Sequence, residues 1–445
     1  MKNTPHVLLV NPWIHDFAAF DFWAKPFGLL TLAALLRLHG FAVSYIDCLD
    51  RFHPRAAKSD LANRHGRGPY LKTRIPKPEG LADIPRHYCR YGIKPAWFRD
   101  DIEALARPDL ILVTSIMTYW YPGIRETIAI LRERLPHVPL VLGGIYATLC
   151  HDHARLTSGA DLAFKGPAED TLLQLVGEFT GYHPERRFDP DDLNTYPSPA
   201  FDLQRHIDCV PLLTSKGCPF NCPYCAAKVL NPDRRTRDPE QVVAEIDYWH
   251  RRWGVEDFVF YDDALLMRPD HHAAPIFEGV IRSGLKVRFH TPNALHIRWI
   301  SREIATLMKR AGFETIRLGL ETAKTDHRPE HDPKVSLEEY HRAVACLKAA
   351  GFEKRHIGVY LLVGLPGQPP EEAIASIRTV RNSGVRPVLT HYTPIPHTEL
   401  WPAAVAASRY DLASDPIFTN NAVFPCQMDS FSWAAVADMK KLAAG

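Results

Sequence analysis

The sequence lacks the features typical of membrane, exported and nucleic-acid-binding proteins. No stretch of its 445 residues approaches 18 consecutive apolar residues, so no membrane span is expected. The apolar run that begins at His6 is too short for a signal peptide. Lys and Arg number 53 against 51 Asp and Glu, and a net charge of +2 argues against an electrostatic grip on nucleic acid as the main role. We therefore expect a cytoplasmic protein with no membrane or nucleic-acid partner.

A disulfide framework, internal repeats and low-complexity tracts are also missing. The chain has nine cysteines and no export signal, a combination that favours a reducing compartment and a metal site. Six of the cysteines are scattered, and we expect buried apolar side chains at Cys48, Cys89, Cys150, Cys209, Cys346 and Cys426. Hydrophobic residues make up 46% of the chain and charged residues 23%, which is ordinary for a globular protein. The length predicts about two to four domains.

The first 180 residues alternate strand and helix signals. Strands are predicted at His6–Asn11, Ala42–Asp47, Asp109–Ser115, Leu140–Gly144 and Asp161–Lys165. Helices are predicted at Gly28–His39, Gly123–Leu135 and Glu169–Phe179. This alternation predicts a doubly wound, flavodoxin- or Rossmann-like parallel sheet over residues 1–180, with ligands at the carboxyl ends of its strands.

An insertion at residues 48–98 interrupts this pattern. It shows no clear period and has eleven Lys and Arg against four Asp and Glu. A solvated surface excursion and a substrate-facing cap both remain open, because long structureless loops are often functional. The polar, proline-rich residues 181–208 are predicted to form a linker.

A second α/β series fills residues 209–400. Its strands are predicted at Pro211–Ser215, Asp257–Tyr261, Lys286–His290, Thr315–Leu320, His356–Val363 and Pro387–His391. Its helices are predicted at Pro239–Trp253, Asp270–Arg282, Ser301–Arg310, Leu337–Ala350 and Glu371–Asn382. Six βα units predict a partial (β/α)6 barrel whose site lies at the carboxyl strand ends, followed by a C-terminal extension at 401–445.

Three cysteines lie close together directly after the first of these strands. Cys218, Cys222 and Cys225 form a C-x3-C-x2-C pattern in a loop with Gly217. A 4Fe–4S cluster usually has four cysteine ligands, so three would leave one iron open for a substrate or cofactor. A structural zinc site needs four closed ligands, and no further Cys lies nearby. The spacing therefore favours an iron–sulfur cluster over zinc or simple packing.

This loop resembles the signature of the radical S-adenosylmethionine (SAM) superfamily, and later segments resemble its supporting motifs. The resemblance implies that the open iron binds SAM. It assigns SAM contacts to the aromatic residue of the loop and to residues that follow the second, fourth and fifth strands, namely Tyr224, Asp262, Asp263, Glu321 and Gly364. Two positions depart from the family pattern: Asp262 and Asp263 replace a Gly-Gly-Glu motif, and His397 replaces a glycine.

A doubly wound domain before such a core resembles the cobalamin-binding radical SAM enzymes. The resemblance assigns cobalamin contacts to strand-end residues, namely Asn11, Thr114, Ser115, Gly143, Gly144 and Gly166. Glycines there would let a bulky ligand approach the backbone. The sequence has no Asp-x-His-x-x-Gly motif, so cobalt is expected to lack a protein histidine, although His15 could approach it. A cofactor-free flavodoxin-like module is the alternative.

The resemblance implies an enzyme with three cofactors: a 4Fe–4S cluster, SAM and cobalamin. It would split SAM reductively to a 5′-deoxyadenosyl radical and methylate an unactivated carbon or phosphorus centre. The expected partners are a small-molecule or peptide substrate and an electron donor such as flavodoxin or ferredoxin. A non-methylating rearrangement or cyclisation is one alternative, and a non-catalytic cobalamin or iron–sulfur sensor is another. The substrate cannot be inferred from the sequence.

Overall fold

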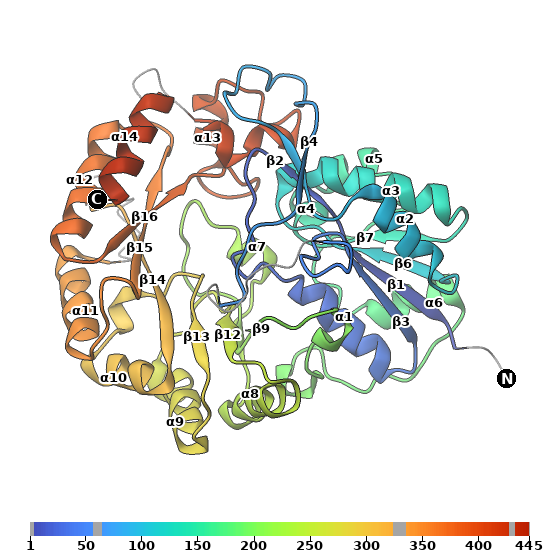
Figure 1. Ribbon diagram of the computed structural model, residues 1–445, viewed down its shortest axis with the longest axis horizontal. Helices are drawn as coiled ribbons and strands as arrows, with labels where there is room; N and C mark the ends of the chain where they lie inside the picture. The colour runs from blue at the N-terminus through green and yellow to red at the C-terminus, as the bar shows by residue number, and fades with distance from the viewer. Residues whose placement is uncertain (1–3, 57–64, 324–334, 427–431, 445) are drawn as a thin grey trace. The chain divides into compact units, whose positions relative to one another are not determined.

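The computed structural model describes residues 4–56, 65–323, 335–426 and 432–444, and the chain divides into two compact units (Figure 1). The first unit comprises Met1–Asp208 and Leu412–Val423, and the second comprises Cys209–Asp411 and Phe424–Gly445. Residues 181–208 thus belong to the first unit, and the chain after residue 401 is divided between the two. No helix within the described ranges is both long enough and apolar enough to cross a membrane.

The first unit is built on a five-stranded parallel sheet. In spatial order its strands are β3 (Ala42–Asp47), β1 (His6–Asn11), β6 (Leu110–Val113), β7 (Leu140–Leu142) and β8 (Leu162–Ala163). This order is that of doubly wound flavodoxin-like sheets. The predicted fold class and all five predicted strands of this unit are confirmed, two of them with the predicted bounds.

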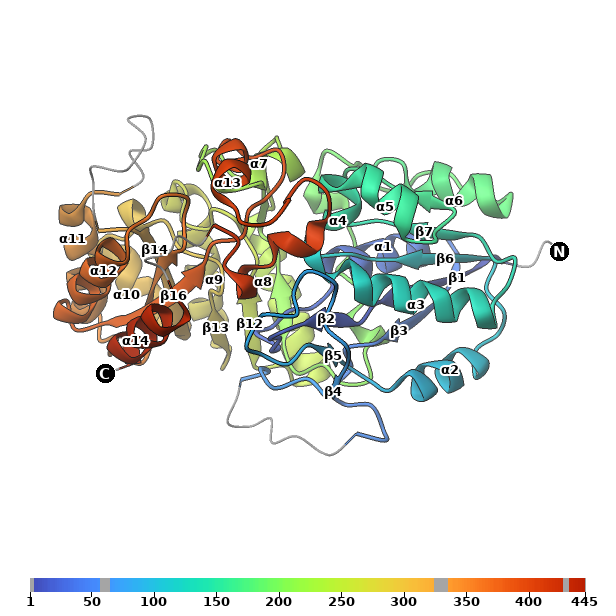
Figure 2. The ribbon, with the colours of Figure 1, turned by 90° about the horizontal axis from the view of Figure 1, so that it is seen from above.

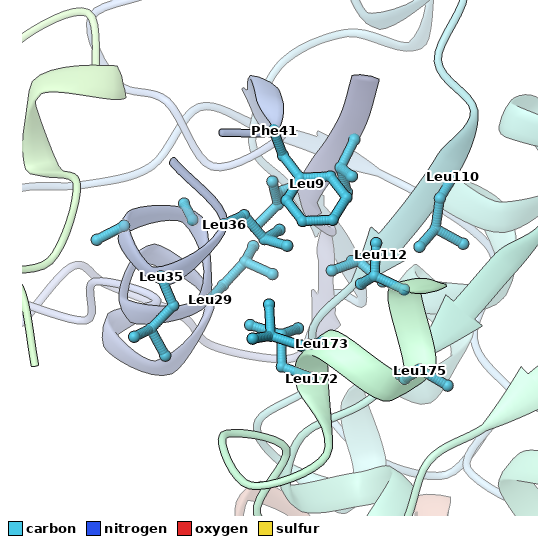
Figure 3. Packing of buried hydrophobic residues seen from close by; sticks show 14 of the residues in the cluster. Leu9, Leu29, Leu35, Leu36, Phe41, Leu110, Leu112, Leu172, Leu173 and Leu175 are labelled. Atoms are coloured by element: carbon cyan, nitrogen blue, oxygen red, sulfur yellow. The ribbon is translucent and has the colours of Figure 1, made fainter. Parts of the chain in front are cut away.

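One face of this sheet carries a leucine-rich core (Figure 3). Helices α1 (Phe27–Leu38) and α6 (Leu172–Thr180) supply Leu29, Leu36 and Leu172, which pack against Leu9 of β1 and Leu112 of β6. Successive side chains of a strand point to opposite faces, so the strand residues next to Leu9 and Leu112 face the other side of the sheet. The two-sided burial explains why these strands are continuous apolar runs.

The remaining helices of the unit connect the strands. They are α2 (Pro95–Glu103), α3 (Tyr121–Arg134), α4 (Ile145–Leu149) and α5 (His151–Thr157). Of these, only α3 was predicted; α4 and α5, with five and seven residues, show too few turns for a clear helical period.

The insertion at 48–98 contains regular structure that the sequence pattern does not reveal. Strands β4 (Lys72–Arg74) and β5 (Cys89–Tyr91) form an antiparallel sheet with β2 (Ile14–Asp16), in the order β2-β5-β4 (Figure 2). Each strand has only three residues, which is too short to show an alternating pattern. Residues 57–64 of the insertion lie outside the described residues.

A buried charge network holds the start of this insertion. The Arg51 guanidinium donates to Asp21 at 3.0 Å and to Asp208 at 2.6 Å, and Lys25 pairs with the same two carboxylates at 3.3 and 2.9 Å. All four side chains are less than 10% exposed. Two cations thus neutralise two anions, which compensates for their removal from water.

Residues 412–423 complete the first unit from the far end of the chain. Thr419 hydrogen-bonds Thr118 at 2.9 Å, and the Tyr121 hydroxyl donates to Asp415 at 2.9 Å. The Asn420 amide donates to the carboxylate of Asp16 at 2.9 Å. We call residues 412–423 the return segment.

The second unit contains the predicted partial barrel. Its strands pair in chain order and all in parallel: β9 (Val210–Leu212), β12 (Asp257–Phe260), β13 (Arg288–His290), β14 (Phe313–Glu321), β15 (Ile357–Val363) and β16 (Arg386–His391). Between them lie α8 (Pro239–Trp253), α9 (Ala273–Ser283), α10 (Arg302–Ala311), α11 (Leu337–Ala349) and α12 (Pro370–Asn382). The predicted six strands and five helices are confirmed, and Ser336 and Glu339 form a capping box at the start of α11.

Candidate cofactor sites

The three clustered cysteines lie in a small hairpin directly after β9. Strands β10 (Ser215–Lys216) and β11 (Arg235–Thr236) pair antiparallel, and the segment between them carries Cys218, Cys222 and Cys225. We call residues 215–236 the cysteine hairpin. None of the three is in a disulfide, and two are half-buried and one exposed. Of the six scattered cysteines, four are buried as expected, whereas Cys150 and Cys346 are only half-buried.

The cysteine hairpin is fixed by its glycine and by contacts with other parts of the second unit. Gly217 has φ of +86°, and a Cβ there would lie 2.4 Å from the carbonyl oxygen of Asp233, so only glycine fits. The ring of Phe220 stacks on His296 with centroids 4.3 Å apart. The backbone N–H of Leu400 donates to the carbonyl of Pro223 at 2.8 Å.

The electrostatics of the hairpin favour thiolates. Burial lowers the pKa of Arg234, while Asp262 and the Cys218 thiol act in the opposite direction. Two buried nitrogens of Arg234, Nε and Nη2, have no hydrogen-bond partner among the described residues. A cation close to a cysteine stabilises its ionised form, which is the form that binds iron. Three cysteines in one loop beside this cation fit an iron–sulfur cluster.

The predicted SAM contacts all follow strands of the second sheet and therefore lie along one edge of it. Tyr224 is half-buried within the hairpin, Asp262 and Asp263 follow β12, Glu321 ends β14 and Gly364 follows β15. Asp262 is 3% exposed, and both of its carboxylate oxygens accept hydrogen bonds from Thr214 and Ser215. Asp263 is exposed to solvent on one side. The loss of water on its other side and the charge of Asp262 raise the pKa of its carboxyl.

Glu321 and His397 have unusual backbone conformations. Glu321 has φ of +65°, beside a shift in the register between β14 and β15. Such a conformation costs roughly 1–3 kcal/mol and persists where the surroundings enforce it. Thr322 donates to Glu372 at 2.9 Å and holds the next residue in place. His397 has φ of +68°, which explains why the family pattern has glycine at this position.

The buried Gln368 shapes the loop of Gly364, whose φ is +87°. Its side-chain carbonyl accepts from the backbone N–H of Gly364 at 2.8 Å, and its amide donates to the carbonyl of Leu362 at 3.1 Å. Gln368 was not among the predicted site residues, although its position directly after Gly364-Leu-Pro-Gly367 was a usable signal.

The predicted cobalamin contacts lie at the carboxyl edge of the first sheet. The Ser115 hydroxyl, after β6, donates to the carbonyl of Gly143 at 2.6 Å, after β7. Thr148 continues the connection, because it donates to the carbonyl of Gly144 at 2.8 Å and accepts from the N–H of Gly166 at 3.1 Å. Thr148 was missed because it lies inside the short helix α4. Thr114 is half-buried beside Ser115.

The two adjacent glycines of this edge differ in their surroundings. A Cβ at Gly144 would lie 2.3 Å from the carbonyl oxygen of Ser115, and φ there is +95°. A Cβ at Gly143 would have no atom within 4 Å. Met117 and Ile145, next to these strand ends, are 40% and 36% exposed. Open space bordered by exposed apolar side chains fits a bulky ligand such as cobalamin.

Asn11 and His15 already have partners. The Asn11 amide donates to Asp47 at 2.8 Å and joins β1 to β3. Burial and the nearby charge of Asp50 raise the pKa of Asp47 to about 6. His15 Nε2 lies 2.8 Å from Glu126, which also accepts two hydrogen bonds from Arg90. His15 is thus committed to Glu126 in this structure.

Comparisons with known proteins agree with this geometry. Residues 212–396 match the family model of the radical SAM superfamily, and residues 87–176 match that of the B12 binding domain. An uncharacterized methyltransferase of Pyrococcus horikoshii is 24% identical over 67% of this chain and 70% of its own. An anaerobic magnesium-protoporphyrin IX monomethyl ester cyclase of Synechocystis sp. is 26% identical over 48% of each chain. The chain thus spans about half the length of that cyclase.

A solved structure shares the fold across almost the whole chain. It is the radical S-adenosylmethionine methyltransferase TsrM from Kitasatospora setae with cobalamin and an iron–sulfur cluster bound. The TM-score is 0.69 at 18% identity, and the match covers 99% of this chain and 91% of that one. At this identity the similarity shows the fold alone.

Proposed function

Because the chain joins a radical SAM domain to a B12 binding domain, we propose that it is a cobalamin-dependent methyltransferase that acts on an unactivated carbon or phosphorus centre. The two domains imply a 4Fe–4S cluster, SAM and cobalamin as cofactors. The observation that carries the proposal is the cysteine hairpin, in which three cysteines, none of them in a disulfide, follow the first strand of the parallel sheet.

The protein's own residues would position the cluster, SAM and cobalamin. When bound, the cluster supplies the electron that splits SAM, and the cobalamin supplies a methyl carrier. Cys218, Cys222 and Cys225 would hold the cluster, and the strand ends around Asp263 and Glu321 would orient SAM. The space beside Gly143 would admit the cobalamin. Holding reactants in a productive geometry accounts for much of the catalysis in such sites.

Two partners follow from this chemistry. A small-molecule or peptide substrate accepts the methyl group, and an electron donor such as flavodoxin or ferredoxin reduces the cluster. A relative named as a methyltransferase supports transfer of a methyl group. A relative named as a cyclase keeps a non-methylating reaction as the second candidate.

The test measures the products formed from SAM. Protein reconstituted anaerobically with iron, sulfide and cobalamin should bind about four irons per chain. With SAM and a strong reductant it should form 5′-deoxyadenosine, together with S-adenosylhomocysteine whose formation requires cobalamin. The triple variant Cys218→Ala, Cys222→Ala, Cys225→Ala should lose the irons and the 5′-deoxyadenosine. The control Cys346→Ala, at a half-buried cysteine of α11, should keep both.

The product pattern separates the alternatives. Formation of 5′-deoxyadenosine without S-adenosylhomocysteine would favour a rearrangement or cyclisation. An intact cluster with no SAM-derived product would reject the enzyme proposal in favour of a sensor.

A further inference from the structure

Asp262 is a buried carboxylate, and burying a carboxylate is costly unless hydrogen bonds compensate for the water it loses. It follows β12 and is 3% exposed. Its partners are Thr214, the residue before the cysteine hairpin, and Ser215, the first residue of the hairpin. Oxygen Oδ1 accepts from the hydroxyls of Thr214 at 2.6 Å and Ser215 at 2.7 Å, and from the backbone N–H of Ser215. Oxygen Oδ2 accepts from the backbone N–H of Thr214 at 3.2 Å.

The direction of these hydrogen bonds can be assigned. An ionised carboxylate only accepts, so the single hydroxyl proton of Thr214 is used on Asp262. The same Thr214 oxygen lies 2.8 Å from His272 Nε2, which must therefore be the donor. Nε2 of His272 therefore carries a proton, and burial lowers the pKa of the ring. The result is an ordered chain from His272 through Thr214 to Asp262.

All members of this chain are buried. Thr214 and Ser215 are fully buried, and His272 is 4% exposed. A hydrogen bond to an ionised group is stronger than one between neutral groups, and its strength increases in a low-dielectric interior. The contacts therefore fix the backbone of residues 214 and 215 rigidly.

These two residues are the base of the cysteine hairpin. Ser215 pairs with Thr236 in the short β10–β11 ladder, and the N–H of Arg237 donates to the carbonyl of Thr214 at 2.8 Å. Both ends of the hairpin thus meet at the point where Asp262 binds. Any movement of this base would be transmitted to the segment that carries the three thiols.

We propose that Asp262 is a positioning residue that anchors the base of the cysteine hairpin and so fixes the arrangement of Cys218, Cys222 and Cys225. This inference rests on the proposed function, in that a cluster must bind there. It gives Asp262 a role distinct from the SAM contact predicted from sequence, which then falls to Asp263 alone at this strand end.

The test uses Asp262→Asn, which keeps the size of the side chain but turns an NH₂ group toward donors. We expect roughly 10-fold faster loss of iron to a chelator from the reconstituted protein, at the low end of the range for residues that orient metal ligands. The electron paramagnetic resonance spectrum of the reduced cluster should also shift before SAM is added. Ser215→Ala, which removes only one donor, should change both readouts in the same direction but less, and it covers the case in which Asp262→Asn fails to fold.

Asp257→Asn is the matched control. Asp257 is a buried carboxylate at the start of β12, the opposite end of the strand from Asp262, and it pairs with Arg288 and His290. Asp257→Asn should lower the midpoint of thermal unfolding while leaving the rate of iron loss and the electron paramagnetic resonance spectrum unchanged.

Three results would decide against the inference or against its premise. Wild-type iron retention and spectrum in both Asp262→Asn and Ser215→Ala would overturn it. An unchanged spectrum without SAM, combined with loss of the SAM-induced change, would make Asp262 a SAM ligand and also overturn it. A wild-type protein that binds no iron would instead refute the proposed function.

Discussion

Gly143 and Gly144 are adjacent glycines that serve different purposes. Gly144 is required by the fold, since its positive φ and the close carbonyl of Ser115 leave no room for a side chain. Gly143 faces open space, so the fold alone does not explain the absence of a side chain there. Sequence reasoning assigns both to ligand binding, and only coordinates separate the two roles.

Gly143→Val should therefore weaken cobalamin binding by roughly tenfold or more, or about 1.4 kcal/mol, because its side chain enters the open space. The thermal stability of the protein without cobalamin should stay within about 0.5 kcal/mol of wild type. Equilibrium dialysis with hydroxocobalamin measures the first quantity, and thermal unfolding measures the second. Gly144→Ala provides the contrast, since it should destabilise the protein itself. Unaltered cobalamin affinity in Gly143→Val would remove the residue from the binding site.

Glu126 makes stability depend on pH in a defined window. Burial opposes its ionisation, but hydrogen bonds from His15 and Arg90 outweigh this and lower its pKa to about 2. A carboxyl whose folded pKa lies below its unfolded value of 4.5 stabilises the protein above about pH 4.5 and loses this contribution as the pH falls toward 2. Because Glu126 is only about half buried, solvent screening reduces this contribution below the full value of the pKa shift.

Glu126→Gln should accordingly be less stable at pH 7 and should lack this loss between pH 4.5 and 2. Urea unfolding of both proteins across the window gives the difference. Glu133→Gln is the control on the same helix, because Glu133 is exposed and its pairing with Arg99 is screened by solvent. Parallel curves for wild type and Glu126→Gln would show that the carboxylate is not the cause.

At the scale of elements, the sequence predicted best where helix ends carry their own signals. Helix α8 has the predicted bounds because Asp238 caps its N-terminus and Gly254 ends it in the left-handed conformation. Strands β2, β4 and β5 were missed because each has only three residues. Their positions are set by pairing between distant segments, such as Ile14 with Tyr91, which a local pattern does not contain.

One side chain of the return segment, Asn420, contacts a buried carboxylate of the first unit. The Asn420 amide bonds the buried carboxylate of Asp16, whose pKa is raised by burial and lowered by its donors. Asn420→Ala should destabilise the first unit by about 1–3 kcal/mol, because it leaves Asp16 with one donor fewer in a buried place. Thermal unfolding with a probe in the first unit measures this loss. Asn421→Ala, at a half-buried neighbour that is not among the donors to Asp16, should have little effect. Equal losses in the two variants would refute the assigned role.

At the scale of the whole molecule, the sequence pattern predicted the topology. The alternating elements were sufficient to predict both parallel sheets, and with the C-x3-C-x2-C pattern they place the candidate site residues at the carboxyl strand ends. They could not identify Thr214, Thr148 or His272, which act through contacts with residues far away in the sequence. The division of residues after 401 between two units was equally hidden, because the return segment has no distinctive composition.

The return segment has a consequence for how the protein is made. Residues Met1–Asp208 of the first unit precede the second unit in the chain, yet the first unit also includes Leu412–Val423, which follow almost all of the second unit. At about 5–20 residues per second, the roughly 200 intervening residues take about 10–40 s to synthesise. During that interval Asp16 lacks its hydrogen bond from Asn420, so the first unit is incompletely folded and a chaperone could recognise it. The unit that is translated first thus gains its last segment only after most of the second unit has been made, and translation speed becomes a variable that acts on its folding yield.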